Sequence, residues 1–249
     1  MKTYCGVRCL DEAINRITDK TKRRWAAQSA SLFSNYIELK DASDLWCKAK
    51  PSKDQRVITY IGKYDTKSVA KSMTSFPCRS DFIYHFYSDN ANLKSIDPHF
   101  QEAKEIEVIE DPIHEVTFSI VWILRKSYGS YKSRDAVLSV LKFTVGEVHY
   151  IITHSVDHPD FPKHRTPVRS KLDSVVTEIR SSWNKRDTIV TRLVSEDPKE
   201  KVPLLYPGKL VEQTGQGLTR LRKAMSQWEY LLCNVLKIFR GKSYKRELV

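Results

Sequence analysis

Apolar residues in the first forty positions recur at helical spacing. The stripe is formed by Leu10, Ile14, Ile17, Trp25, Leu32, Phe33, Tyr36 and Ile37. Residues three and four apart lie on one face of a helix, so this spacing predicts an amphipathic helical segment at the start of the chain.

A period of two replaces the helical spacing in the middle of the chain. Every even position from Val116 to Leu124 is large and apolar, which predicts a strand whose even residues line an interior. Further strands are predicted over residues 57–61, 68–76, 135–143, 148–156, 168–179 and 188–195, with a short helix over 80–87. The short turns between the later strands indicate an antiparallel meander, because parallel strands need crossover connections.

Helical spacing returns near the end of the chain. Apolar residues step by three and four from Leu218 through Leu221, Met225 and Trp228 to Phe239. The pattern predicts a helix over residues 214–240, about 40 Å long, that packs on the chain's own sheet. We therefore expect one α+β domain over residues 1–249, with a helical segment at 1–44, a core at 45–240 and a basic tail at 241–249.

A strongly twisted sheet of this size curls, and one helix cannot fill its concave side. The remaining volume is either a solid core or a cavity that selects an apolar ligand, and periodicity leaves both possibilities open. The side chains predicted to face this interior are Phe118, Trp122, Leu138, Val140, Tyr150, Ile152 and Trp228, together with Leu221 and Met225 of the last helix.

The charge of the chain points to an acidic partner. The 249 residues include 42 Lys or Arg and 30 Asp or Glu, a formal charge of +12. Residues 217–249 hold eight of these cations and two Glu, so this segment carries +6. Because no nucleic-acid-binding motif accompanies the charge, we expect an anionic membrane as the partner and no nucleic acid, with plain solubility as the alternative. The predicted docking residues are Lys237, Arg240, Lys242, Lys245 and Arg246.

Several classes of protein do not fit the sequence. The first ten residues lack the apolar region of a secretory signal, and the longest apolar run, Phe118 to Leu124, is far shorter than the roughly 20 residues of a membrane span. The five cysteines are an odd number and are scattered along the chain, which suits reduced thiols. We expect a cytoplasmic monomer that associates with membranes only transiently.

The sequence also gives little support for a catalytic site or a metal site. His149 and His154 fall on opposite faces of a strand, so they do not make a preformed metal site. His154 and Ser155 are strand neighbours that point apart, so they cannot act as base and nucleophile. With no Gly-x-Ser-x-Gly sequence and no phosphate-binding glycine loop, we expect no enzyme, no metal and no cofactor.

An ordered series of short motifs resembles the START (steroidogenic acute regulatory protein-related lipid transfer) family. The resemblance covers roughly residues 45–240. It rests on Ser133-Arg134-Asp135, the segment Ser155 to Pro162, Val168-Arg169, Phe76, Asp89, Leu93, Ile96-Asp97, Thr188 to Asp197, Val202-Pro203 and Leu218 to Lys223.

The resemblance implies a helix-grip fold, in which a curved antiparallel sheet wraps a long C-terminal helix around an internal hydrophobic tunnel for one lipid. It implies that the protein carries a phospholipid or sterol between membranes, with Arg134 and Arg169 as candidate headgroup contacts. Arg134, with Asp135, could instead anchor the end of the strand, and Arg169 could be a surface arginine. Val140 stands where many START domains have a second arginine, so a contact with the ligand's polar group at that position is not expected. The loop 157–167 and the start of the last helix are candidate lids. The alternatives are a lipid-sensing regulatory or interaction module and, less favoured, a basic nucleic-acid-binding protein.

Overall fold

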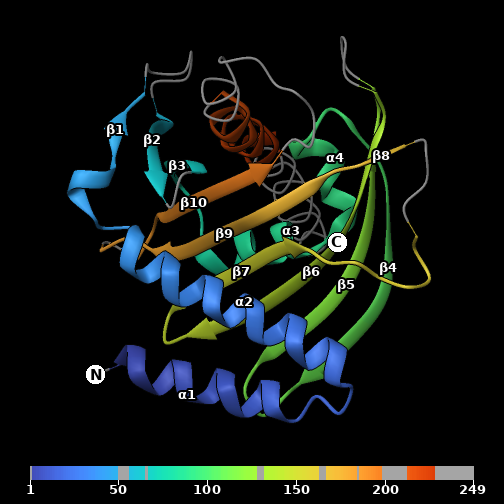
Figure 1. The fold of residues 1–249 in the computed structure, drawn as a ribbon. Helices are drawn as coiled ribbons and strands as arrows, with labels where there is room; N and C mark the ends of the chain where they lie inside the picture. The colour runs from blue at the N-terminus through green and yellow to red at the C-terminus, as the bar shows by residue number, and fades with distance from the viewer. Residues whose placement is uncertain are drawn as a thin grey trace, which may run out of the picture.

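A ten-stranded sheet organises the chain (Figure 1). The computed structural model describes residues 2–49, 56–64, 67–127, 132–162, 167–183, 185–197 and 212–227. Its helices are α1 (Lys2–Asn15), α2 (Lys20–Leu39), α3 (Ser80–Ser88), α4 (Leu93–Ile96) and a helix over residues 212–227, with short 3-10 turns at Ser43–Leu45 and Asn90–Asn92. Its strands are β1 (Cys47–Lys48), β2 (Ile58–Tyr64), β3 (Lys67–Phe76), β4 (Phe100–Asp111), β5 (Val116–Arg125), β6 (Arg134–Val145), β7 (Val148–Ser155), β8 (Val168–Arg169), β9 (Lys171–Ser181) and β10 (Thr188–Asp197).

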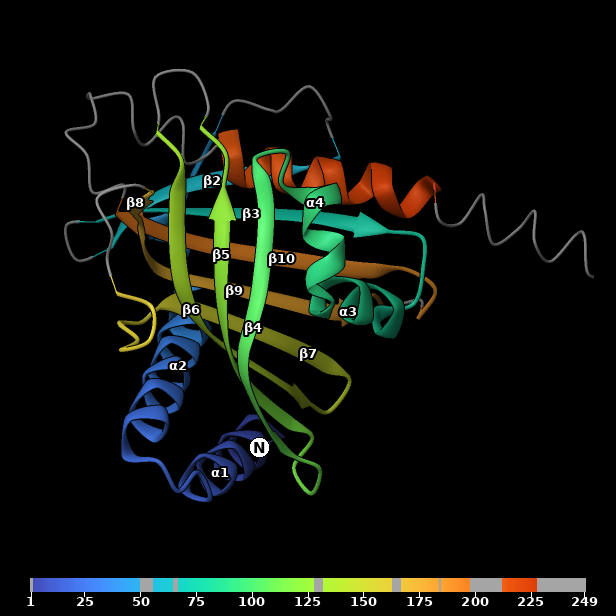
Figure 2. The ribbon, with the colours of Figure 1, turned by 90° about the vertical axis from the view of Figure 1, so that its right-hand side faces the viewer.

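The sheet is antiparallel, curved and open. Its strand order is β1-β2-β3-β10-β9-β7-β6-β5-β4, with the short β8 paired in parallel to the start of β6. Strands β1 and β4 form the two edges, so the sheet does not close into a barrel. Figure 2 shows β4 to β6 running steeply across the direction of β3, β10 and β9. The predicted curved antiparallel sheet with a C-terminal helix is confirmed.

Helices cover both faces of this sheet. We call the face that packs against α1 and α2 the outer face, and the face toward α3, α4 and helix 212–227 the inner face (Figure 2). The buried side of α2 consists of Ala26, Ser29, Phe33 and Tyr36, at the three- and four-residue spacing of one helix face. The ring of Phe33 packs edge-on, with centroid distances of 5.0 Å to Phe143 and 4.8 Å to Tyr150.

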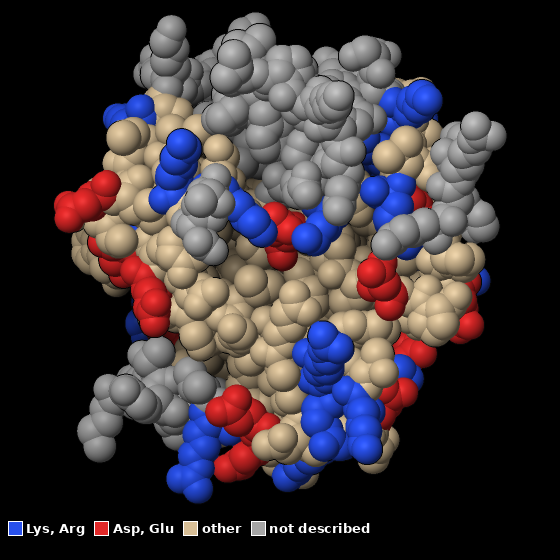
Figure 3. Space-filling view, in the orientation of Figure 1, with Lys and Arg blue, Asp and Glu red and all other residues tan. Residues whose placement is uncertain are grey.

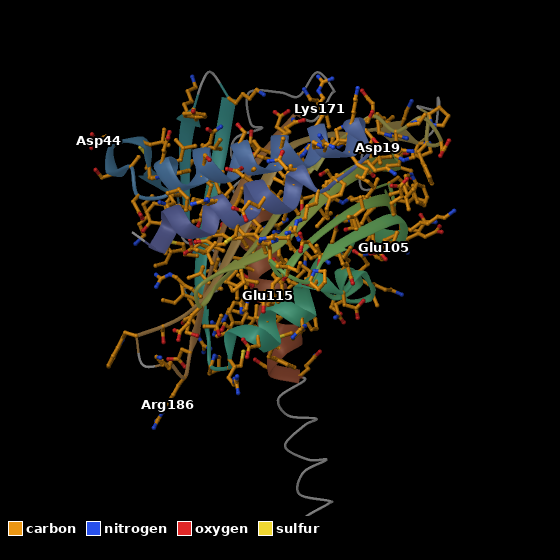
Figure 4. The ribbon with its side chains drawn as sticks, turned by 90° about the horizontal axis from the view of Figure 1, so that it is seen from below. Asp19, Asp44, Glu105, Glu115, Lys171 and Arg186 are labelled. Carbon is orange, nitrogen blue, oxygen red and sulfur yellow. The ribbon has the colours of Figure 1, made fainter. Side chains whose placement is uncertain are left out.

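The N-terminal segment forms two helices rather than one. The side chain of Asp19 accepts hydrogen bonds from the backbone N–H groups of Thr21 and Lys22, which caps α2. Asp19 thus lies at one end of α2 and Asp44 beyond the other (Figure 4). Lys and Arg side chains gather near the start of α2 (Figure 3), where Lys22 forms a 2.6 Å ion pair with Glu107 of β4.

A buried carboxylate ties the end of α2 to the sheet. Glu178 of β9 is 3% exposed and accepts hydrogen bonds from the hydroxyl of Tyr36 at 3.2 Å and from Nζ of Lys40 at 2.9 Å. Arg180 lies 3.3 Å from its other oxygen. Burial, together with the charge of Glu178, raises the pKa of Tyr36. The tyrosine therefore stays neutral and continues to donate.

Strand β4 was not predicted from the sequence. Its register with β5 shifts twice, between Phe100 and Glu102 and between Glu105 and Glu107, so its apolar residues do not alternate regularly. It is also an edge strand with many charged, exposed residues, a composition that discourages pairing with other chains.

A buried ion pair fixes the start of β6. Nε of Arg169 donates to one oxygen of Asp135 at 2.9 Å and Nη2 donates to the other at 2.8 Å. The side chains are 10% and 6% exposed, and Nε1 of Trp122 also donates to Asp135 at 3.0 Å. The pair holds β8 beside β6, which a two-residue strand could not maintain alone.

Removing the arginine should therefore destabilise the protein. We expect Arg169→Met to lower the free energy of unfolding by about 3–5 kcal/mol, because it leaves the carboxylate of Asp135 buried without a counter-charge. Adding Asp135→Asn removes that charge and retains an acceptor for Trp122, so the double variant should lose less than the sum of the two single losses. Urea denaturation measures all three variants. A loss below about 1 kcal/mol for Arg169→Met would contradict this role.

Candidate functional site

Helix 212–227 packs on one half of the inner face. Its Leu218, Leu221 and Met225 are buried in an apolar cluster with Ile179 of β9 and Val190 of β10. Residues of α3 and α4, including Ile83, Phe86 and Ile96, belong to the same cluster. The apolar stripe that predicted this helix therefore faces the sheet over its described length.

Two glycines let this helix approach the sheet closely. A Cβ atom at Gly215 would lie 2.9 Å from Oγ1 of Thr59 in β2, and one at Gly217 would lie 3.1 Å from Nη1 of Arg192 in β10. Further along, Nη1 of Arg222 donates to the backbone oxygen of Ser75 in β3. These contacts place the described helix over β2, β3 and β10.

The other half of the inner face carries a separate apolar cluster. Its buried members come from β5 and β6, and partly buried residues from β4, β6 and β9 pack against them: Val121, Ile123, Ala136 and Leu138, then Ala103, Val140 and Leu172. Within the described part of the chain, no helix contributes to this cluster. Val140 also packs against the cluster under helix 212–227, so it lies at the junction of the two. The buried apolar residues of the inner face thus form two groups, with Val140 between them.

Polar side chains accompany this apolar surface. Lys142 follows Val140 by two residues on β6 and therefore faces the same side of the sheet. Its Nζ donates to the backbone oxygen of Ser88 at 2.9 Å, and burial lowers its pKa. Ser119 of β5 is directly opposite Val140 in the register and is 1% exposed. A cation and a hydroxyl thus stand beside the apolar cluster.

Several residues predicted to line the interior lie on the outer face instead. Phe118, Tyr150 and Ile152 are buried in the cluster under α1 and α2, and Trp122 packs against the same cluster. That part of the predicted set is wrong. Both faces of β5 are buried, so alternation alone could not show which set of residues faces the C-terminal helix. Leu138, Val140, Leu221 and Met225 do lie on the inner side, while Trp228 lies outside the described residues.

The two predicted headgroup arginines separate in the structure. Arg169 belongs to the outer side, where it anchors Asp135. Arg134, one residue before Asp135, points by alternation to the inner side and pairs in register with Arg125. The predicted membrane-docking residues, Lys237, Arg240, Lys242, Lys245 and Arg246, lie outside the described residues.

The described part of the loop that follows β7 lies on the outer side. The ring of His158 lies 6.0 Å from that of Trp25 in α2, and the ring of Phe161 lies 6.3 Å from that of Trp122. A hollow of about 230 Å³ is lined by His158 and Phe161 together with Asp157, Pro162 and Arg169. Residues 157–162 therefore do not cover the inner face, as the expected lid would.

His154 has a structural role. His154 is 1% exposed on the outer face, and its Nε2 lies 3.1 Å from the backbone oxygen of Trp25. Oγ of Ser155 instead accepts from the backbone N–H of Leu172 at 2.8 Å, so the pair makes no nucleophile–base contact. The described residues contain no group of three or more His, Cys, Asp or Glu arranged to hold a metal ion.

Among the described helices, none is both long and apolar enough to cross a bilayer.

Known structures share this architecture. Human StAR-related lipid transfer protein 5 superposes with a TM-score of 0.72 at 13% sequence identity, covering 83% of this chain and 98% of its own. Human STARD10 gives a TM-score of 0.69 at 17% identity, covering 82% of both chains. The lipid transfer and protein localization domain of human StarD13 gives 0.60 at 15%, covering 77% of this chain and 94% of its own. At these identities the similarity establishes the helix-grip fold. A search of curated protein sequences finds no match.

The sequence also matches the model of a protein family. The sequence model of the START domain matches residues 34–227, which takes in the end of α2, the whole sheet and the described C-terminal helix. START domains are lipid-binding and transfer modules that are generally not enzymes. The chain belongs to the START domain family.

Proposed function

We propose that this chain binds one lipid molecule, a phospholipid or a sterol, against the inner face of the sheet and transfers it between membranes without catalysing a reaction. The observation that carries the proposal is the inner-face cluster around Leu138 and Val140, whose described members all belong to strands. A sixteen-carbon chain costs on the order of 13 kcal/mol in water, at about 0.8 kcal/mol per methylene. An apolar tunnel between that cluster and the C-terminal helix would remove this cost during transfer.

The proposed ligand contacts belong to strand β6 and to the described C-terminal helix. They are Leu138, Val140, Leu221 and Met225, with Arg134 at the start of β6. We propose that the protein acts in the cytoplasm as a monomer with a single START domain, and that its contact with membranes is brief.

The membrane contact has a candidate on the hairpin between β9 and β10. Trp183 is 95% exposed there, and backbone bonds from Ser182 N–H to the Asp187 oxygen (2.8 Å) and from Lys185 N–H to the Ser182 oxygen (3.0 Å) fix the turn. Arg186 lies at the tip of the same hairpin (Figure 4). Tryptophan favours the headgroup region of a bilayer, and lysine and arginine are attracted to anionic lipids. The described helix 212–227 ends at the same end of the molecule (Figure 2).

Filling the inner face should block lipid transfer. We expect Val140→Trp to slow the transfer of a fluorescent phosphatidylcholine and of a fluorescent sterol between vesicles by at least about tenfold, because a bulky ring at the junction of the two clusters occupies the ligand's space. Val148→Trp is the matched control, since Val148 is also half-buried but packs on the outer-face cluster.

The control should transfer at close to the wild-type rate, with thermal unfolding used to confirm that both variants are folded. Transfer by Val140→Trp at the wild-type rate would contradict the proposed site. Binding of either probe by the wild type without exchange between vesicles would instead support the lipid-sensing alternative.

Removing the exposed tryptophan should weaken membrane association. We expect Trp183→Ala to lower partitioning onto vesicles containing phosphatidylserine by roughly tenfold, or about 1.4 kcal/mol. Ile113→Ala is the control, because Ile113 is 73% exposed on the distant β4–β5 hairpin. Sedimentation with vesicles measures both variants, and equal losses for the two would rule out a specific role for Trp183.

A further inference from the structure

Two polar side chains of the inner face are neighbours across β5 and β6. Ser119 is paired with Val140, and Lys142 is paired with Thr117, in the antiparallel register. Ser119 and Lys142 are therefore diagonal neighbours on one face, with Cα atoms about 7–8 Å apart. A small group placed between them can contact both.

The hydroxyl of Ser119 lacks a partner. The residue is 1% exposed, and its Oγ makes no hydrogen bond within the described structure. A buried polar atom without a partner is destabilising, and such atoms are rare in folded proteins. On the inner face of β5 the next residue in line is the apolar Val121, and the residue opposite is Val140. An external polar group would satisfy this hydroxyl.

The ammonium group of Lys142 has spare donors. It donates one hydrogen bond, to the last carbonyl of α3 at Ser88, whereas a lysine ammonium carries three donors. Among the described residues no carboxylate lies within ion-pair distance of it. The residue is half-buried, and burial lowers its pKa. The bond to Ser88 accounts for the position of the side chain, but it provides no directly paired counter-charge.

Two carboxylates lie further out around the same lysine. Glu105 of β4 (labelled in Figure 4) and Asp89 at the end of α3 both act on Lys142 electrostatically and oppose the fall in its pKa. Next to the lysine and serine a phosphate oxygen would be favoured, whereas near the carboxylates a cation would be favoured. A zwitterionic headgroup provides both charges in one molecule, and a sterol hydroxyl provides neither.

We propose that Lys142 and Ser119 bind the phosphate of a zwitterionic phospholipid, with its ammonium group toward Glu105 and Asp89. This inference rests on the proposed lipid-binding function and narrows its ligand class. It also assigns a polar contact to β6 two residues after Val140.

The test compares three fluorescent probes on the full chain: phosphatidylcholine, phosphatidic acid and a sterol. The wild type should bind phosphatidylcholine most tightly. Lys142→Met should weaken phosphatidylcholine binding at least tenfold and leave sterol binding within about twofold, because it removes the charge but retains the apolar stem. Ser119→Ala should weaken phosphatidylcholine binding about threefold. Lys142→Arg retains the charge and should bind phosphatidylcholine almost as tightly as the wild type.

Lys142→Gln separates the charge of the lysine from its ability to donate hydrogen bonds. It retains N–H donors without the charge, so it should bind phosphatidylcholine as weakly as Lys142→Met even where urea denaturation shows wild-type stability. Unchanged phosphatidylcholine affinity in both variants would overturn the phosphate site while leaving lipid binding intact. Tighter binding of phosphatidic acid than of phosphatidylcholine would overturn the role of Glu105 and Asp89. A wild type that binds none of the probes would contradict the proposed function itself.

Discussion

The contact between α2 and the outer face of the sheet determines which surface is left for a ligand. Phe33 packs against Phe143 and Tyr150, and Glu178 accepts hydrogen bonds from Tyr36 and Lys40 at the end of the same helix. Both contacts hold α2 on the sheet. Separating α2 from the sheet would expose the packed rings to water and would leave the buried carboxylate of Glu178 without the groups that pair with it. The chain's own helices cover much of the outer face, and for this reason we place the proposed ligand on the inner face.

The inner face differs from the outer face in how its apolar residues are covered. On the outer side one cluster joins α1, α2 and the strands. On the inner side the described helix 212–227 covers β2, β3 and β10, while the cluster around Leu138 contains only strand residues in the described structure. Lys142 and Ser119 lie beside that cluster. The inner face thus combines an apolar surface with two polar side chains, and the proposed lipid site rests on this combination.

The sequence predicted most of the long strands and helices, but not which helix covers each face of the sheet. Alternation predicted β5 correctly, yet Val121 and Ile123 are buried as well as Phe118, so a doubly covered strand gives no sign of which helix takes which face. The contact that decides this joins α2 to β6 and β7, over a hundred residues away in the chain, and no local pattern records it. Strand β4 was missed because its two register shifts interrupt the period.

Other features were readable from local signals. Asp19 precedes Thr21 and Lys22 at the start of a helical stripe, which is a capping signal for a second helix. Lys142 shares the parity of Val140, so its place on the inner face followed from the same period of two. The role of Arg169 could not be read in this way, because its partner Asp135 lies 34 residues earlier and is brought beside it only by the pairing of β8 with β6.

The proposed function requires the inner face to enclose one lipid. Native mass spectrometry of the full chain, purified after incubation with mixed phospholipid and sterol vesicles, measures whether it does. We expect a complex heavier than the chain by the mass of a single lipid, which is released and identified on denaturation. A bare chain mass, with an organic extract that contains no lipid, would contradict it.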